Sequence, residues 1–158
     1  MGYNLYVDRK ISDGNEYSAF ILEGEGYYTQ RVYKQPAGGN SKLSYLKTCE
    51  NAADAIRAMF DYNELPAGDV TFLSTHKTLI AYIRFFMNDE RAIKPPVEYF
   101  DAVYATYTAL ERMGVCYDIV YADWATRPRS IANEQNYAAQ GTSKMERAID
   151  AFKDIKED

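Results

Sequence analysis

Three strand-like segments follow one another at the start of the chain, and only short turns separate them. Alternating apolar and polar residues predict a strand over residues 3–8, and similar segments follow over 16–23 and 27–34. The intervening segments 12–15 and 24–26 contain the glycine, asparagine and aspartate residues that are typical of tight turns. Strands joined by such short turns pair in antiparallel fashion. The first 34 residues therefore predict an antiparallel meander.

The rest of the chain alternates between helical and strand-like patterns. The predicted elements are, in order, a helix over 44–62, a strand over 69–74, helices over 76–88 and 97–113, a strand over 115–121 and a helix over about 142–156. A meander followed by strands that helices connect is typical of an α/β domain with a mixed sheet. We therefore predict a single domain over residues 1–158, with the first strand central in a five-stranded sheet and helices on both faces.

Composition excludes several classes of protein. No apolar segment approaches the roughly 20 residues that a membrane-spanning helix needs, and the first ten residues lack the pattern of a signal peptide. Two cysteines, Cys49 and Cys116, are too few for a disulfide scaffold and show no zinc-binding spacing. The one histidine, His76, excludes a metal site built from several histidines. We expect a cytoplasmic protein that does not associate with a membrane.

Charge and aromatic content bear on the kind of partner. The net charge of −5 gives no support for a broad basic surface that would neutralise nucleic-acid phosphates. The chain has 15 tyrosines, a residue common both in sheets and in protein interfaces. These tyrosines could lie on sheets and helix flanks, or form an adhesive interface.

The order of the predicted elements is similar to that of the ribonuclease H family, and short sequence segments support this resemblance. The four segments that resemble family motifs are Tyr6-Val7-Asp8, Asn51–Asp54, Val70–His76 and Asn133–Tyr137. The resemblance implies a mixed sheet with strand order 3-2-1-4-5. It also places Asp8, Asp54, His76 and Tyr137 at the four positions where the family has catalytic carboxylates.

The resemblance implies a defined chemistry, from which this sequence departs. The family cleaves the RNA strand of RNA–DNA hybrids with two magnesium ions, which clamp the attacking water and the leaving oxygen. Magnesium prefers carboxylate oxygens, which here only Asp8 and Asp54 would supply as metal ligands. An imidazole at His76 suits zinc or manganese better, and the protonated phenol of Tyr137 is a poor ligand.

We therefore expect a catalytically degenerate domain that needs no cofactor and acts as a binding or inhibitory module for a protein or nucleic-acid partner. The acidic charge and the tyrosines favour a protein. The alternative is an active ribonuclease H with a rearranged magnesium or manganese site, formed by Asp8, Asp54, His76 and an additional acid at Asp123. A third hypothesis is an unrelated α/β domain with a small-molecule pocket, although no phosphate-binding glycine motif or nucleophile elbow is present.

Three further residues are candidates for nucleic-acid binding. Asn51 resembles the asparagine that the family uses at the minor groove of the hybrid. Arg127 and Arg129 flank Pro128 and could hold a phosphate, or belong to a solvated loop. The other candidates also have ordinary structural interpretations. Asp54 could be a surface residue of a helix, and His76 could simply lie close to a helix N-terminus.

Overall fold

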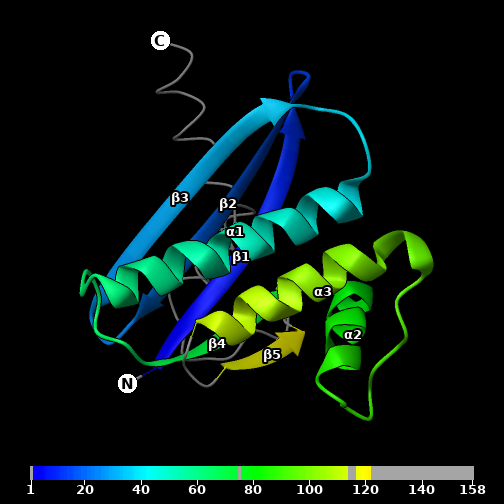
Figure 1. Ribbon diagram of the computed structural model, residues 1–158. Coiled ribbons are helices and arrows are strands. Elements are labelled where there is room, and N and C mark those ends of the chain that lie inside the picture. The colour runs from blue at the N-terminus through cyan, green and yellow to red at the C-terminus, as the bar shows by residue number, and fades with distance from the viewer. Residues whose placement is uncertain (1, 75, 114–116, 122–158) are drawn as a thin grey trace, which may run out of the picture.

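The computed structural model describes residues 2–74, 76–113 and 117–121 (Figure 1). Its elements are β1 (Gly2–Ser12), β2 (Asn15–Gly24), β3 (Tyr27–Pro36), α1 (Ser41–Asp61), β4 (Asp69–Ser74), α2 (Lys77–Phe86), α3 (Val97–Arg112) and β5 (Tyr117–Tyr121). All eight elements predicted before residue 122 are present. The helix predicted over 142–156 lies outside the described residues. Within the described part of the chain, no helix combines the length and apolar character needed to cross a membrane.

The five described strands form one mixed sheet with the order β3-β2-β1-β4-β5, as predicted. β1 pairs with β2 and β2 with β3 in antiparallel fashion, which confirms the meander. β4 pairs in parallel with both β1 and β5. β1 is therefore the central strand, and its two neighbours run in opposite directions.

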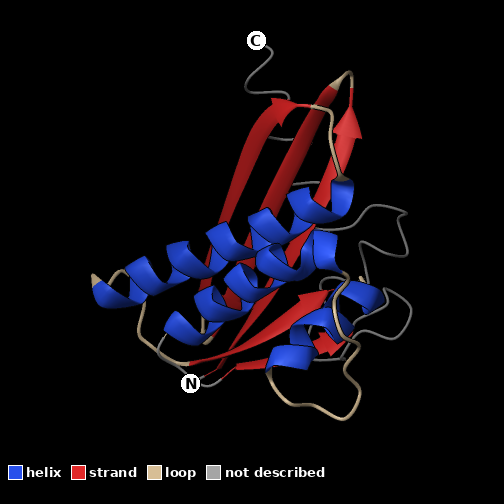
Figure 2. Cartoon of the chain, turned by 45° about the vertical axis from the view of Figure 1, so that its right-hand side comes forward, coloured by secondary structure: helices blue, strands red, loops and turns tan. Residues whose placement is uncertain are grey.

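The three described helices cover one face of the sheet. Alternate residues of β1, namely Tyr3, Leu5 and Val7, point into a large apolar core that includes buried residues of all three helices. α1 and α3 lie side by side across the sheet, and α2 packs at the end nearer β5 (Figures 1 and 2). α1 begins sharply because the Asn40 side chain accepts hydrogen bonds from the backbone N–H groups of Lys42 and Leu43.

The opposite face of the sheet has a smaller apolar cluster. Its buried members are Tyr6, Tyr17, Ala19, Ile21 and Leu73, and the half-buried Val32 and Val120 pack against it. The described residues place no helix on this face, so helices on both faces remain a prediction.

The described tyrosines divide between the core and the surface. Tyr3, Tyr6, Tyr17, Tyr45, Tyr82 and Tyr99 are buried. Tyr27, Tyr28, Tyr33, Tyr62 and Tyr104 are exposed. Three of the exposed tyrosines lie on β3. The described tyrosines therefore include both buried residues of the sheet and helices and a group of exposed residues on one strand.

The β2–β3 turn requires a residue without a side chain at Gly24, and this requirement can be tested. Its φ is +156°, and a Cβ at this position would clash with the backbone carbonyl oxygen of Gly2. Gly26 also has a positive φ, +82°, but a Cβ there would meet nothing within 4 Å. We expect Gly24→Ala to lower the free energy of unfolding by about 2 kcal/mol and Gly26→Ala by about 1 kcal/mol. Urea denaturation of both variants checks this difference, and equal losses would contradict a steric role for Gly24.

Candidate site at the carboxyl end of the central parallel strands

The candidate site lies where the parallel pair β1 and β4 separates. The last paired residues are Tyr6 and Leu73, after which β4 ends at Ser74 and β1 continues through Asp8. Sites in α/β proteins form at such carboxyl ends, because the strands deliver side chains there while the following loops diverge. Ser74 and His76 follow from β4, so the topology brings them to the level of Asp8 on β1.

A buried tyrosine links these elements. The Tyr45 side chain comes from the first turns of α1 and is 1% exposed. Its Oη lies 3.2 Å from the carbonyl oxygen of Val7 and 2.6 Å from Ser74 Oγ. Since a carbonyl only accepts, Tyr45 donates its proton to Val7, and Ser74 then donates to Tyr45 Oη. Ser74 Oγ in turn accepts from the backbone N–H of His76, at 3.0 Å. This chain of hydrogen bonds ties α1, β1, β4 and the start of α2 together.

His76 completes the site at the start of α2. Its ring packs on the Tyr45 ring with centroids 4.0 Å apart. Burial lowers the pKa of His76, the charge of Arg9 lowers it further, and Asp8 opposes both effects. The imidazole therefore favours its neutral form, and it lies close enough to Asp8 to interact with its charge. The structure thus places His76 and Asp8 at the same end of the sheet.

Asp8 itself is half-buried, and its Oδ1 accepts a hydrogen bond from the backbone N–H of Arg9 at 2.8 Å. Its charge also raises the pKa of His76, so the imidazole lies within range of this carboxylate. Within residues 2–74, 76–113 and 117–121, no group of three or more histidine, cysteine, aspartate or glutamate side chains could hold a metal ion. A centre for two magnesium or manganese ions needs several carboxylate ligands, and the described residues do not gather such a set around Asp8.

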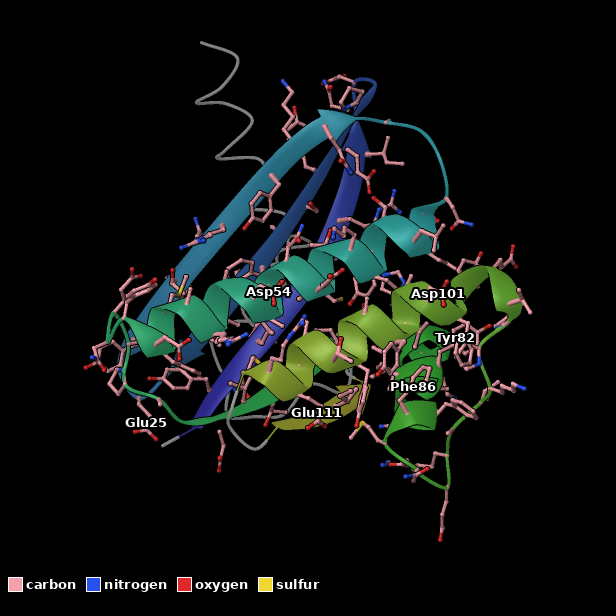
Figure 3. All side chains as sticks on the ribbon, in the orientation of Figure 1. Glu25, Asp54, Tyr82, Phe86, Asp101 and Glu111 are labelled. Carbon is pink, nitrogen blue, oxygen red and sulfur yellow. The ribbon has the colours of Figure 1, made fainter. Side chains whose placement is uncertain are left out.

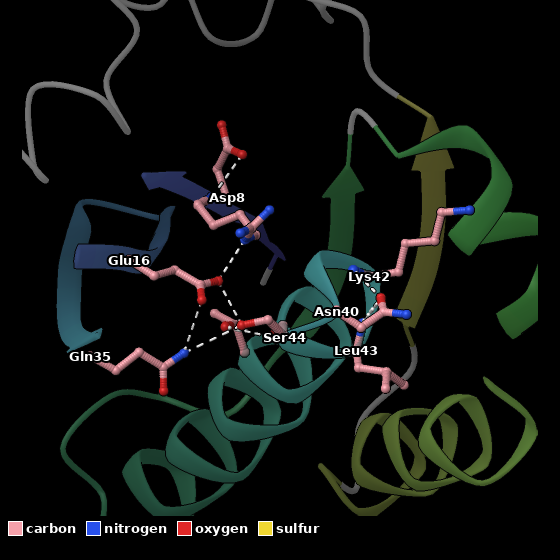
Figure 4. Close-up of polar contacts among 9 residues, drawn as sticks. Asp8, Glu16, Gln35, Asn40, Lys42, Leu43 and Ser44 are labelled. Carbon is pink, nitrogen blue, oxygen red and sulfur yellow. Dashed lines mark hydrogen bonds and ion pairs between the residues drawn. The ribbon is translucent and has the colours of Figure 1, made fainter. Parts of the chain in front are cut away.

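A second polar cluster lies beside Asp8, and our sequence analysis missed it (Figure 4). Glu16 is 2% exposed, and its Oε1 lies 2.6 Å from both Arg9 Nε and Ser44 Oγ, which donate to it. Gln35 Nε2 donates to Glu16 Oε2 at 3.2 Å. Burial alone would raise the pKa of Glu16, but the hydrogen bonds from Ser44, Arg9 and Gln35 and the charge of Arg9 outweigh it and lower the pKa.

A signal for this cluster exists in the sequence. A hairpin closed by the turn after Ser12 sets Arg9 opposite Ser18 and Ile11 opposite Glu16. Arg9 and Glu16 are thus diagonal neighbours on one face of the hairpin, a placement at which opposite charges attract. The turn was predicted, but its register was not followed to this pair.

The structure does not bring Asp54 to Asp8. Asp54 lies in the second half of α1, about 13 Å along the helix axis from Tyr45 at 1.5 Å per residue. Its side chain is 49% exposed, and its Oδ1 lies 3.9 Å from Arg112 Nη2 of α3 (Figure 3). The motif-based placement of Asp54 assumed a position early in the helix. α1 begins at Ser41, so Ser44 and Tyr45 occupy its first turns instead.

The remaining candidates are separate from Asp8 or lie outside the described residues. Asn51 is exposed on α1 and lines a pocket between α1 and β3. Arg127, Arg129, Tyr137 and Asp123 lie outside the described residues.

Comparisons with known proteins give one consistent result. No protein-family model and no curated protein matches the sequence. RNase H1 from Halobacterium salinarum has a similar structure, with a TM-score of 0.55 and 13% identity over 85% of this chain and 96% of that one. The N-terminal RNase H domain of a Mycobacterium tuberculosis protein has a TM-score of 0.55 and 12% identity, over 89% and 97% of the two chains. An RNase H1 named LC11, solved with an RNA/DNA hybrid, has a TM-score of 0.52 and 12% identity over 80% and 89%. These likenesses show a ribonuclease H-like fold.

Proposed function

We propose that this ribonuclease H-like domain is catalytically degenerate and acts as a binding module, in some settings an inhibitory one, for a protein partner. One observation carries the proposal. The hydroxyl groups of Tyr45 and Ser74 next to Asp8 are satisfied by each other, by the carbonyl of Val7 and by the N–H of His76. These side chains hold elements of the fold together, and their hydrogen bonds need no metal ion.

Electrostatics explains why such an arrangement suits a domain without two-metal chemistry. Clustered carboxylates repel one another, and bound cations are what make such a cluster favourable. Here Glu16 is compensated by Arg9, Ser44 and Gln35, and Asp8 accepts a hydrogen bond from the backbone N–H of Arg9. The described part of the site is therefore stable as it stands. This supports a structural role for the polar side chains that surround Asp8 at this end of the sheet.

The choice of a protein partner follows from charge. The chain has a net charge of −5, which disfavours broad contact with nucleic-acid phosphates. Arg9, the cation next to Asp8 in sequence, is bound to Glu16 at 2.6 Å and is only 15% exposed. A phosphate approaching Asp8 would find this guanidinium already paired. Binding to a protein surface, unlike binding to phosphates, does not require unpaired basic side chains at this place.

A second function has a specific observation in its favour. Asp8 and His76 lie at the same end of the central parallel strands and interact electrostatically. This arrangement supports a rearranged manganese- or magnesium-dependent ribonuclease H. The similar LC11 enzyme was solved with an RNA/DNA hybrid. In this alternative Asp8 would hold the metal ion, and residues beyond those described would complete its ligands.

A cleavage assay separates the two functions. We expect no cleavage of a labelled RNA–DNA hybrid by the full chain in either magnesium or manganese. Asp8→Asn and the matched variant Asp54→Asn are assayed in parallel, because Asp54 lies on the surface of α1 away from Asp8. Cleavage that Asp8→Asn abolishes and Asp54→Asn leaves intact would overturn the proposal and establish the enzyme.

A further inference from the structure

The outer edge of β3 is open among the described strands. β3 is the last strand of the sheet on the side of β2 (Figure 2). Most of its residues are exposed along its full length. Its sequence, Tyr27–Pro36, includes the exposed Tyr27 and Tyr33. An exposed strand edge presents a row of N–H and C=O groups that can pair with another extended chain.

The turn geometry tells which residues present those groups. Glu25 and Gly26 form a two-residue turn with φ of +53° and +82°, and Gly24 lies opposite Tyr27. In such a hairpin the closing pair is hydrogen-bonded, and hydrogen-bonded pairs then alternate along the ladder. The backbone groups of the alternate residues Gln30, Val32 and Lys34 therefore point outward, away from β2.

The charged residues of β3 indicate what net charge a segment bound to this edge should carry. β3 contains two cations, Arg31 and Lys34, and no acidic residue, although the whole chain has a net charge of −5. The two side chains alternate across the sheet, with Arg31 on the helix-covered face and Lys34 over the Tyr17 ring of the other face. A segment paired with β3 would meet one cation on each of its own faces.

A pocket beside the edge provides room for side chains. It has a volume of about 470 Å³ and lies between β3 and α1. The residues that line it and matter here are Tyr33, Gln35, Leu43, Ser44, Lys47 and Asn51. Its lining combines polar groups with apolar surface, and Lys47 in it is paired with Glu50 at 3.3 Å.

We propose that the β3 edge binds an acidic, extended segment of a protein partner as an added antiparallel or parallel strand. Main-chain hydrogen bonds to Gln30, Val32 and Lys34 supply the affinity, and Arg31 and Lys34 select acidic side chains. A second copy of this chain is a poorer occupant, because its own β3 contains no acidic residue that could pair with Arg31 or Lys34. The inference rests on the proposed function, since it names the partner of that binding module.

A displayed library of random 12-residue peptides, panned against the full chain, tests the inference. We expect enriched peptides to be acidic and rich in β-branched residues, and fluorescence anisotropy measures their affinity. Arg31→Glu combined with Lys34→Glu should weaken binding at least about tenfold, the value of 1.4 kcal/mol. The matched control is Lys42→Glu combined with Arg57→Glu on α1, which changes the net charge equally and should weaken it much less.

Strand pairing is tested separately from charge. Gln30→Pro removes one outward N–H while leaving the pairing with β2 intact, so it should abolish binding without loss of the folded state, and Gln30→Thr should not. No enrichment, enrichment of basic peptides, or binding indifferent to these variants would overturn the inference. Concentration-dependent dimerisation lost in Gln30→Pro would also overturn it in favour of self-association. Hybrid cleavage has a different readout, so the two proposals fail independently.

Discussion

Tyr45→Ala is expected to lower the free energy of unfolding by about 4 kcal/mol, the usual cost of removing a buried aromatic ring. The ring is 1% exposed and packs in the main core. Its hydroxyl also joins the carbonyl of Val7 to Ser74. The substitution therefore creates a cavity and leaves two polar groups without their partner.

Tyr45→Phe separates these contributions. It keeps the ring and removes only the hydroxyl, so we expect a loss of about 1 to 2 kcal/mol. The control is Tyr62→Ala, because Tyr62 is 76% exposed and its loss should change stability by less than about 0.5 kcal/mol. Urea denaturation of all three variants provides the comparison. If Tyr45→Ala lowered the free energy of unfolding by no more than Tyr62→Ala does, Tyr45 would not be the stabilising link that we infer.

The same substitution has a spectroscopic readout. Burial is the main cause that lowers the pKa of His76, and the Tyr45 ring is packed against the imidazole. In Tyr45→Ala the imidazole gains access to water, so we expect the pKa of His76 to rise toward its ordinary value. The single histidine makes this titration easy to follow by NMR. An unchanged His76 titration would show that other groups bury the imidazole.

Glu16→Gln is expected to lower the free energy of unfolding at neutral pH by about 3 kcal/mol, because it removes one partner of a buried ion pair. Arg9 Nε and Ser44 Oγ both donate to the lost charge at 2.6 Å. The neutral amide cannot compensate the Arg9 guanidinium, which is 15% exposed. Glu50→Gln on α1 is the matched control, since its partner Lys47 is exposed and such pairs contribute less than about 1 kcal/mol.

The effect of Glu16 should depend on pH in a defined direction. The pKa of Glu16 is lowered in the folded state from an ordinary value of 4.5. A lowered folded-state pKa stabilises the protein fully above the ordinary value, and the contribution is lost as pH falls through the folded-state value. The stability difference between wild type and Glu16→Gln should therefore shrink in acid. Urea denaturation at pH 7, 4 and 3 measures it, and a constant difference would contradict this account.

The length of the strands shows one limit of local pattern. The sequence predicted a strand over 3–8, whereas β1 extends to Ser12. Apolar and polar residues stop alternating at Arg9 and Lys10, so the periodicity ends there. The tight turn keeps Ser12 opposite Asn15, and the ladder therefore runs to the turn itself. Pairing with β2 extended the strand beyond the residues whose own pattern favours it.

The candidate site shows a second limit. The family resemblance placed His76 and Asp8 together, and the structure brings them to one end of the sheet because Asp8 lies on β1, His76 follows β4 and these two strands are parallel. Asp54 could not be placed by its motif, because its distance from Asp8 depends on which turn of α1 packs against the end of β1. Tyr45 in the first turns of α1 reaches Val7, and Asp54 lies nine residues further along the helix, on the surface near Arg112.

The sequence by itself determined the meander, the order of the elements and the central place of β1. The meander and the order of the elements follow from periodicity and turn residues, which are local, and the central place of β1 follows from that order. Only the tertiary structure decided that Glu16 is buried against Arg9, Ser44 and Gln35, and that Tyr45 joins β1 to β4. Such contacts unite residues from different elements, and their distances depend on register and helix position together. Neither quantity is encoded in any single segment, so the chemistry of the site became visible only in the folded chain.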